Sequence, residues 1–345
     1  MKVMGFSQHG NYEVIKEFTI DDPKVSDLDV LIKIEMTSIN TLDIMTRNGI
    51  PGFNFNLPHV PGSDVIGKIE AVGKNVKDFS IGDKVIVNTV YGCGKCYQCK
   101  SGYEAQCPLW QCLGLHVNGS YSELISVPHS SVSKVPAGFS DEELSAMPLH
   151  VPLAWRNIKK LAKAREGESI LIRGASGNVG IFAILFSLAL KLNVIALSGS
   201  PEKESKLKKL GKITVLSSNK SATELNKEIL DITNGKGVDI ILESFGSTLG
   251  NSVDLAAYNA RIVSFGVLTG AESSLNVRKL YLKNISIFGT HNASKQEFDE
   301  ALEFVSKNNI HPIINSSYNI KDASKAQSIF EKHEIFGKII LKNRF

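Results

Sequence analysis

The amino-acid sequence predicts an α/β protein that combines a β-rich segment with a doubly wound parallel sheet. Two patterns carry this prediction. Residues 1–133 form short β segments separated by glycine, proline and aspartate, whereas strand and helix patterns alternate from residue 169 onward. Such alternation is typical of parallel sheets covered by helices. A chain of 345 residues is long enough for two domains with substantial cores.

The first part of the chain contains three strand candidates. Val30–Ile34 alternates between apolar and polar residues, and Val65–Val72 and Lys84–Val90 are longer candidates. The dipeptide Gly82-Asp83 marks a tight turn between strands. The pattern then becomes helical over Glu142–Leu161.

A strand–turn–helix–strand unit follows. Ser169–Arg173 is a strand candidate, Ile181–Leu192 is an apolar run of helical length, and Val194–Leu197 is a second strand. A glycine-rich turn at this place is where a dinucleotide pyrophosphate binds, because free N–H groups and the positive end of the helix dipole favour an anion. We therefore predict cofactor binding by Gly174, Ala175, Ser176, Gly177, Asn178, Val179 and Gly180.

The alternation continues to residue 288 and is followed by a shorter mixed segment. Four further strand candidates are Ile213–Leu216, Val238–Leu242, Arg261–Phe265 and Ile285–Phe288. Helices are expected at Ser294–Ser306 and Lys321–Lys332, before a final strand at Lys338–Leu341. Since a strand of the parallel sheet leads into them, we expect Phe265, Gly266 and Val267 to pass near the nicotinamide.

The end of the second strand of the unit indicates which dinucleotide binds. An acidic residue usually holds the ribose 2′-hydroxyl of NAD at this place. This chain has Ser198, Gly199 and Ser200 there, followed by Lys203, and its first carboxylate is Glu202. Hydroxyls and a lysine suit a 2′-phosphate, so we predict NADP(H) rather than NAD.

The most specific motif is a cluster of four of the five cysteines with the spacing C-x2-C-x2-C-x7-C. Four thiolates brought together by tight turns form a closed tetrahedral zinc site without an open position for substrate. We predict one structural zinc; a reduced metal-free cluster and an iron–sulfur site are the alternatives. The predicted ligands are Cys93, Cys96, Cys99 and Cys107.

Composition argues against several other classes of function. The net charge of +4 is small, and no basic block has interleaved aromatic residues, so nucleic acid is not an expected partner. The longest apolar run is shorter than the roughly 20 residues that span a bilayer, so no membrane association is expected. The N-terminal residues lack the apolar core of a signal peptide. We expect a cytoplasmic protein, in which clustered cysteines favour metal over disulfides.

Taken together, these features resemble the medium-chain dehydrogenase/reductase superfamily, which contains zinc alcohol dehydrogenases and quinone oxidoreductases. The motifs that carry the resemblance are NTLD at 40–43, PGSDVIG at 61–67, AVG at 71–73, FSIGDKV at 79–85, the cysteine lobe at about 91–112, PLHVPLAW at 148–155, the glycine-rich turn, and FGK at 336–338. The resemblance implies a GroES-like domain at 1–150, a Rossmann domain at 151–288, and a return to the first domain at 289–345. It also implies a homodimer or homotetramer and a cofactor contact by Lys338.

The chain departs from the zinc alcohol dehydrogenases at the catalytic metal. In those enzymes the ligands stand at the positions of Asn40, Ser63 and about Leu149, and none of these residues is a good zinc ligand. The resemblance therefore implies that the catalytic zinc is missing. A substitute site from Asp43, Asp64 and His150 is the less favoured alternative.

Without that metal, the pattern resembles the quinone oxidoreductase branch, which acts on conjugated carbonyl compounds. The candidate catalytic residues are Asn40 and Ser63 as hydrogen-bond donors, Asp64, and His150 as proton donor. Each also has a structural interpretation: a turn amide, a buried hydroxyl, a carboxylate that holds its neighbours, and a core histidine. The expected activity is NADPH-dependent reduction of a quinone, enal or enone. Alternatives are an alcohol dehydrogenase, an enoyl-CoA thioester reductase, and a nucleotide-binding protein without activity.

Overall fold

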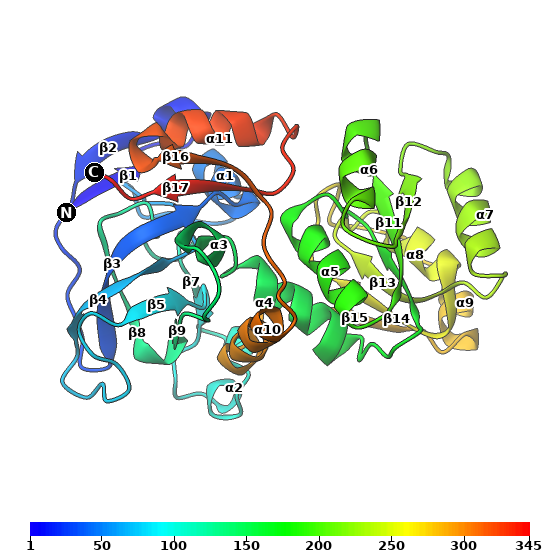
Figure 1. Cartoon of the computed structure of the whole chain (residues 1–345), viewed down its shortest axis with the longest axis horizontal. Helices are drawn as coiled ribbons and strands as arrows, with labels where there is room; N and C mark the ends of the chain where they lie inside the picture. The colour runs from blue at the N-terminus through cyan, green and yellow to red at the C-terminus, as the bar shows by residue number, and fades with distance from the viewer. The chain divides into compact units, whose positions relative to one another are not determined.

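The computed structural model describes residues 1–345, and the chain divides into two compact units (Figure 1). The first unit combines Met1–Pro152 with Ala293–Phe345, and the second comprises Leu153–Asn292. In sequence, the second unit is therefore inserted between the two parts of the first. None of the helices is both long and apolar enough to cross a membrane.

A seven-stranded sheet forms the centre of the first unit. Its order is β16 (Ile314–Asn319), β17 (Lys338–Lys342), β3 (Asp29–Ser38), β4 (Ile66–Val72), β5 (Lys84–Val87) and β9 (Val132–Lys134), and β8 (Leu124–Pro128) also pairs with β3. All pairs are antiparallel except β16 with β17. Because β17 pairs with β3, both parts of the chain contribute to one sheet.

The alternating pattern of β3 explains how this sheet is packed. Val30, Ile32 and Ile34 are buried and lie in one apolar core with Val85 and Val127 from neighbouring strands. Side chains alternate between the two faces of a strand, so an alternating sequence buries one face. The longest strand thereby becomes the scaffold on which β4, β8 and β17 are placed.

The remaining elements of the first unit are short. Two small sheets pair β1 (Lys2–Gly5) with β2 (Lys16–Thr19) and β6 (Val90–Tyr91) with β7 (Gln111–Cys112). The helices are α1 (Thr41–Asn48), α2 (Tyr97–Lys100), α3 (Asp141–Ser145), α4 (His150–Trp155), α10 (Lys295–Lys307) and α11 (Ala323–Glu331). Helix α4 begins in the first unit and ends in the second.

The second unit is built on a parallel six-stranded sheet. Its order is β12 (Thr214–Ser217), β11 (Asn193–Ser198), β10 (Ser169–Ile172), β13 (Val238–Glu243), β14 (Ala256–Ser264) and β15 (Ser286–Gly289). Counted from β10, this is the order 3-2-1-4-5-6 of dinucleotide-binding sheets, so the predicted doubly wound Rossmann sheet is confirmed. The helices are α5 (Asn178–Ala189), α6 (Pro201–Lys208), α7 (Ala222–Ile232), α8 (Leu249–Leu255) and α9 (Val277–Leu282).

The structure corrects two predicted elements. The helix expected over Glu142–Leu161 is divided into α3, α4 and a π-helical segment, Arg156–Leu161. Pro148 separates the first two helices, because proline lacks a backbone N–H and clashes with the preceding turn. The strand expected over Lys84–Val90 is divided into β5 and β6, because the Asn88 amide donates locally to the Val90 carbonyl oxygen at 3.0 Å.

Candidate functional site

Asn40 directly precedes α1, and Asp43 lies in the first turn of this helix. The backbone N–H of Asn40 donates to the Asp43 carboxylate at 2.8 Å. Asp43 also accepts the N–H of Gly62 at 3.2 Å and lies 3.3 Å from the Tyr121 hydroxyl. Its two oxygens thereby tie the start of α1 to the loop that precedes β4.

That loop presents Ser63 and Asp64 to Asn40. Gly62 has a φ of 103°, and a Cβ at this position would collide with the Ser120 hydroxyl, so only glycine fits. The Asn40 side-chain amide donates to Ser63 Oγ at 3.0 Å and to Asp64 Oδ2 at 2.9 Å. All three side chains are fully buried.

A lysine from the C-terminal segment joins them. The antiparallel register of β17 on β3 places Lys338 beside Asn40, and only 2% of its surface is exposed. Its ammonium donates to Asn40 Oδ1 at 2.6 Å and to Asp64 Oδ2 at 2.9 Å, and it lies 3.3 Å from His150 Nδ1. We refer to the following residues as the buried polar cluster: Asn40, Ser63, Asp64, His150 and Lys338.

Asp64 is the anion of this cluster. Burial raises its pKa, but the Lys338 ammonium and the hydrogen bonds from Ser38 and Asn40 outweigh burial and leave the pKa below its ordinary value of 3.8. Its other oxygen accepts the backbone N–H of the residue at 149 at 2.9 Å. Asp64 is thus an ionised carboxylate that accepts hydrogen bonds from Ser38, Asn40, Lys338 and one backbone N–H, and it is not a general acid.

His150 is neutral in the cluster. Burial, reinforced by the nearby Lys338 ammonium, lowers its pKa from 6.5 to about 3. An ammonium can only donate, so a neutral His150 accepts at Nδ1 and carries its proton on Nε2. His150 keeps 8% of its surface exposed, and no hydrogen bond to Nε2 is present in the structure.

Asp43 and Lys338 carry pKa shifts of their own. Burial, with the Asp64 charge adding to it, raises the pKa of Asp43 to about 7 despite the two backbone donors. Burial also lowers the pKa of Lys338, although Asp64 opposes this shift. The cluster therefore contains an ionised carboxylate, Asp64, and an ammonium, Lys338, whose pKa is lowered. The Asp43 carboxyl, which lies next to the cluster, has a pKa of about 7.

The four catalytic candidates of the sequence analysis are thus brought together, and one partner was missed. Lys338 was expected only as a cofactor contact, although a lysine at the start of the apolar run KIILK is the signal of a buried, paired charge. Asp43, Asp64 and His150 are engaged by other partners: the latter two bind Lys338, and Asp43 binds backbone amides. An ammonium among these groups repels a divalent cation.

The glycine-rich turn of the second unit joins β10 to α5. Gly177 precedes the helix and no side chain caps it, so the first amides of this 12-residue helix are available to an anion. A Cβ at Gly180 would collide with the Gly174 carbonyl oxygen, whereas one at Gly177 would lie 3.3 Å from the same oxygen. These features fit a dinucleotide pyrophosphate.

The end of β11 contains hydroxyls and a lysine. Ser198 Oγ donates to the Ser200 carbonyl oxygen at 3.2 Å, and Ser200 Oγ accepts the backbone N–H of Lys203 at 3.3 Å. The first carboxylate, Glu202, is paired with Lys206 at 2.5 Å. The carboxylate nearest to the end of β11 is therefore already paired with a lysine.

The loop after β14 runs along the carboxyl end of β13. The Phe265 N–H donates to the Glu243 carbonyl oxygen at 3.0 Å, and a Cβ at Gly266 would lie 2.6 Å from the Ser244 carbonyl oxygen. Val267 is 58% exposed. Ligands of such sheets bind outside the carboxyl ends of the strands, where this loop lies.

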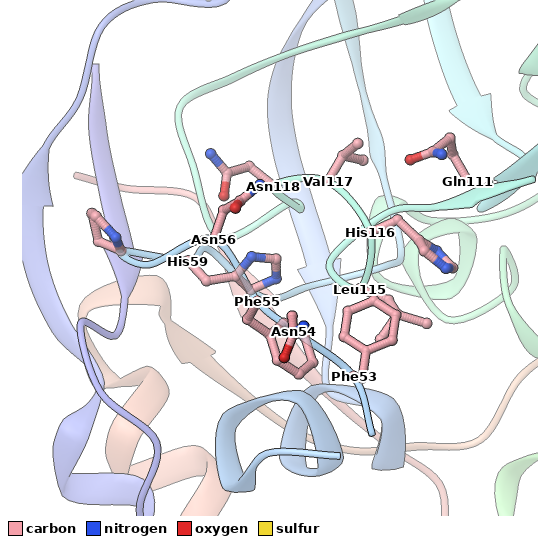
Figure 2. Close-up of a pocket in the computed structure, with 11 residues that line it drawn as sticks. Phe53, Asn54, Phe55, Asn56, His59, Gln111, Leu115, His116, Val117 and Asn118 are labelled. Atoms are coloured by element: carbon pink, nitrogen blue, oxygen red, sulfur yellow. The ribbon is translucent and has the colours of Figure 1, made fainter. Parts of the chain in front are cut away.

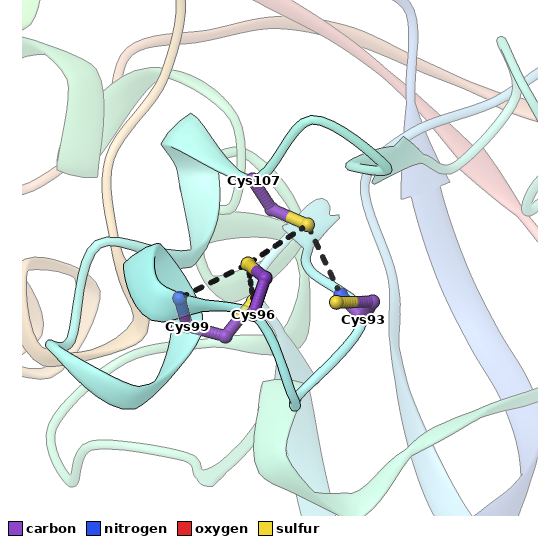
Figure 3. A group of neighbouring side chains, drawn as sticks. All are labelled: Cys93, Cys96, Cys99 and Cys107. Carbon is purple, nitrogen blue, oxygen red and sulfur yellow. Dashed lines mark hydrogen bonds between the residues drawn. The ribbon is translucent and has the colours of Figure 1, made fainter.

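The four predicted zinc ligands form one group in the first unit (Figure 3). All four sulfur atoms lie within 4.8 Å of one another, and Cys96 Sγ is 3.5 Å from Cys99 Sγ and 3.7 Å from Cys107 Sγ. A tetrahedral site with Zn–S bonds of about 2.3 Å needs sulfur separations of about 3.8 Å. A Cβ at Gly92 would lie 2.5 Å from Cys99 Sγ, so glycine leaves room for the group. The group therefore fits zinc.

A cavity of about 510 Å³ lies beside the loop that leads to β4 (Figure 2). Its lining contains no acidic or basic group apart from two histidines, and burial lowers the pKa of one of them, His59. Phe53 and Phe55 contact each other with ring centroids 4.5 Å apart. Sequence reasoning did not identify this cavity, since its two loops follow no motif. The lining residues are Phe53, Asn54, Phe55, Asn56, Pro58, His59, Gln111, Leu115, His116, Val117 and Asn118.

Two family models match the chain. The model "Alcohol dehydrogenase GroES-like domain" matches residues 26–137, within the first unit. The model "Zinc-binding dehydrogenase" matches residues 178–307, which begin at the N-terminus of α5.

Curated proteins and solved structures are similar over nearly the whole chain. An acryloyl-coenzyme A reductase of Metallosphaera sedula is 29% identical over 345 residues, with 99% of each chain covered. A quinone oxidoreductase of Mus musculus is 28% identical, with 99% of this chain and 97% of the mouse protein covered. A cobalt- and zinc-bound alcohol dehydrogenase from Pyrobaculum aerophilum has a TM-score of 0.87 at 29% identity, with 99% of both chains covered.

Proposed function

Because the chain belongs to the medium-chain dehydrogenase/reductase superfamily, we propose that this oxidoreductase reduces a conjugated carbonyl compound with NADPH and without a catalytic zinc. The observation that carries the proposal is the buried polar cluster. At the place of a zinc-ligating cysteine, Asn40 accepts a hydrogen bond from the Lys338 ammonium at 2.6 Å.

The donor set supports chemistry without a metal on the substrate oxygen. A catalytic zinc needs about three nitrogen, sulfur or carboxylate ligands and one open position. Asn40 and Ser63 are poor zinc ligands, and the one carboxylate that contacts Asn40 through its side chain, Asp64, is bound to Lys338. A dication could bind to Asn40 and Asp64 only if the Lys338 ammonium moved away from them.

A conjugated carbonyl is reduced most easily by hydride addition to the carbon far from its oxygen. A bound reduced nicotinamide supplies that hydride. Negative charge then develops on the carbonyl oxygen, and preorganised hydrogen-bond donors stabilise it. The Ser63 hydroxyl, whose oxygen accepts from Asn40, supplies a donor of this type, and His150 supplies an N–H at Nε2 while it stays neutral. Both amide N–H groups of Asn40 are used inside the cluster, so Asn40 orients Ser63 and Asp64. We assign cofactor binding to the second unit and these three roles to the first.

The preference for NADPH rests on the end of β11. Ser198 and Ser200 offer hydroxyls, Lys203 offers a cation, and the nearest acid is paired with Lys206. An aspartate would repel a 2′-phosphate, whereas this segment attracts one. Titration of wild-type protein with NADPH and NADH tests the preference, and tighter binding of NADH would contradict it.

A substrate panel tests the reaction class. We expect NADPH oxidation with enones, enals or quinones and slower oxidation of simple alcohols. Ser63→Ala should lower kcat roughly tenfold to a thousandfold, the cost of losing an oxyanion donor, without changing NADPH affinity. Asn40→Ala should also lower kcat, because Ser63 then loses the amide that orients it. Asn315→Ala, at an exposed position of β16, is the matched control. Faster turnover of alcohols than of enones would refute the proposal.

A thioester-linked enoyl substrate is the second candidate. The cavity beside the β4 loop favours it, because four carboxamides, from Asn54, Asn56, Gln111 and Asn118, suit an uncharged chain that carries amide groups. The acryloyl-coenzyme A reductase among the relatives agrees with this. We expect a higher kcat/KM for acryloyl-CoA than for a free enal, and Asn54→Ala and Asn118→Ala should remove the difference. Equal values for both substrates in wild type would exclude this candidate.

The proposal also covers the structural metal, the cellular location and the oligomeric state of the protein. Cys93, Cys96, Cys99 and Cys107 would hold one structural zinc, whose role is to fix the surrounding loop. We propose a cytoplasmic location, because clustered cysteines in a reducing compartment favour metal binding over disulfides. We propose a homodimer or homotetramer, and light scattering of the purified protein tests this assembly.

A further inference from the structure

We propose that Lys338 is the proton source of the reaction and that it delivers its proton to the substrate through His150. The inference rests on the proposed function, because it concerns the proton that follows hydride addition. It assigns Lys338 a role different from a contact with the cofactor and gives His150 the role of a relay.

The geometry leaves one route for the proton. The ammonium of Lys338 has three N–H groups and three partners, Asn40 Oδ1 at 2.6 Å, Asp64 Oδ2 at 2.9 Å and His150 Nδ1 at 3.3 Å. The Asn40 oxygen belongs to an amide and passes no proton onward. The Asp64 carboxylate is fully buried and is enclosed by donors. Only the imidazole can accept a proton at one nitrogen and release another at the opposite nitrogen.

His150 is also the most accessible of the three charged or titratable side chains in the cluster. His150 keeps 8% of its surface exposed, compared with 2% for Lys338 and none for Asp64. Its Nε2 makes no hydrogen bond in the structure, although Nδ1 is engaged. His150 therefore has a donor left for a substrate atom, whereas the three donors of Lys338 are all in use.

The charge states of the two residues indicate that Lys338, and not His150, carries the transferable proton before the reaction. Burial lowers the pKa of His150 to about 3, so an imidazolium is almost absent at neutral pH. Lys338 keeps its proton, because Asp64 and Asp43 oppose the effect of burial, yet its pKa is lower than that of an exposed lysine. Lys338, Asp43, Asp64 and His150 interact at this place, and Tyr121 and Cys112 interact with the two carboxyl groups.

The step balances as follows. Addition of a hydride, which a bound reduced nicotinamide would supply, to the β-carbon of the substrate would leave an enolate. The enolate takes the proton from His150 Nε2 as the Lys338 Nζ–H bond breaks and a new N–H bond forms at His150 Nδ1. The products are the saturated carbonyl compound, the oxidised nicotinamide and a neutral lysine, which takes a proton from solvent while the imidazole returns to its first tautomer.

Lys338→Arg is the decisive variant. An arginine keeps the positive charge next to Asp64 but does not give up a proton at any pH at which the protein is folded. We expect kcat for an enone to fall about a hundredfold or more, with NADPH affinity and melting temperature near those of wild type. The decrease of wild-type kcat at high pH, caused by loss of the Lys338 proton, should disappear. Lys342→Arg, on the same strand and paired with Glu142, is the matched control.

His150→Gln tests the relay itself. Because both residues act in one transfer, we expect the double variant with Lys338→Arg to be no slower than the slower single variant. A Lys338→Arg variant with kcat within threefold of wild type would overturn the proposal. So would weaker NADPH binding with unchanged kcat at saturating NADPH, since this outcome assigns Lys338 to the cofactor.

A substrate-free measurement separates this inference from the proposed function. Nitrogen-15 NMR of labelled histidine reports the tautomer, and we expect His150 to carry its proton on Nε2 in wild type. The Nδ1–H tautomer, or a charged imidazole at pH 7, would overturn the relay whatever the substrate. If wild type shows the expected tautomer but reduces no conjugated carbonyl, the proposed function fails, and the relay fails as the proton source of that reaction.

Discussion

Replacing His150 should make the free energy of unfolding depend on pH in a range where that of the wild-type protein is nearly constant. Asp43 has a pKa of about 7 in the folded protein against 3.8 when unfolded, so the folded state binds one more proton between these values. Its contribution to stability is present below pH 3.8 and is lost as pH rises toward 7. His150 has a folded pKa of about 3 against 6.5, so its contribution is lost as pH falls from 6.5 toward 3.

The two contributions have opposite slopes over their shared interval, between the unfolded pKa of 3.8 for Asp43 and that of 6.5 for His150. Each amounts to about 1.4 kcal/mol per pH unit, the value for one proton. They cancel in wild type. In His150→Gln only the Asp43 slope remains, so the free energy of unfolding of the first unit should fall by about 3 kcal/mol relative to wild type over two pH units.

Urea unfolding at several pH values in this interval measures the effect. The chain has two tryptophans, Trp110 in the first unit and Trp155 in the second, so a Trp155→Phe background makes fluorescence report the first unit alone. Asp43→Asn is the control and should show the opposite slope, with stability rising with pH. A His150→Gln profile parallel to that of wild type would refute the charge states assigned to the cluster.

Three further predictions concern the metal and the cofactor. Cys96→Ser should reduce the zinc content from about one per chain to nearly none by elemental analysis, and a metal-free wild type would contradict the structural site. Ser198→Asp should weaken NADPH binding about tenfold or more and favour NADH in fluorescence titrations, because a carboxylate repels the 2′-phosphate. Gly180→Ala should lower stability by about 1–3 kcal/mol or displace the turn, since its Cβ would collide with the Gly174 carbonyl oxygen. Gly199→Ala, whose Cβ would meet only a hydroxyl at 3.7 Å, should have little effect on either melting temperature or cofactor affinity.

Local patterns predicted the second unit well. The strand, turn and helix around Gly174–Gly180 follow from a short apolar run, glycines and a longer apolar run, and the structure has β10 and α5 at these places. Parallel strands that are buried on both faces read as continuous apolar runs, which makes them visible in the sequence. The alternation of strands and helices also predicted a parallel, doubly wound sheet, whereas the order of its six strands comes from the structure.

The first unit was less predictable because its elements depend on distant partners. β16 (INSSYN) is polar and lies at an edge of the sheet, so neither apolar content nor alternation reveals it. β8 pairs with β3 although about 90 residues separate Lys33 from its partner Leu124. Long-range pairing of this kind leaves little trace in a local window, since the energy comes from contacts with another segment.

By itself, the sequence determined the dinucleotide-binding turn and the spacing of the four cysteines, because in both cases neighbouring residues make the site. Through the resemblance to zinc alcohol dehydrogenases, it also implied that Asn40 and Ser63 stand at the positions of zinc ligands. Only the tertiary structure decided what surrounds them. The pairing of β17 with β3 brings Lys338 to Asn40 across 298 positions of the chain, and burial then sets the charges of Asp64 and His150. Charge states depend on desolvation and on the distance between groups, and both exist only once the chain is folded.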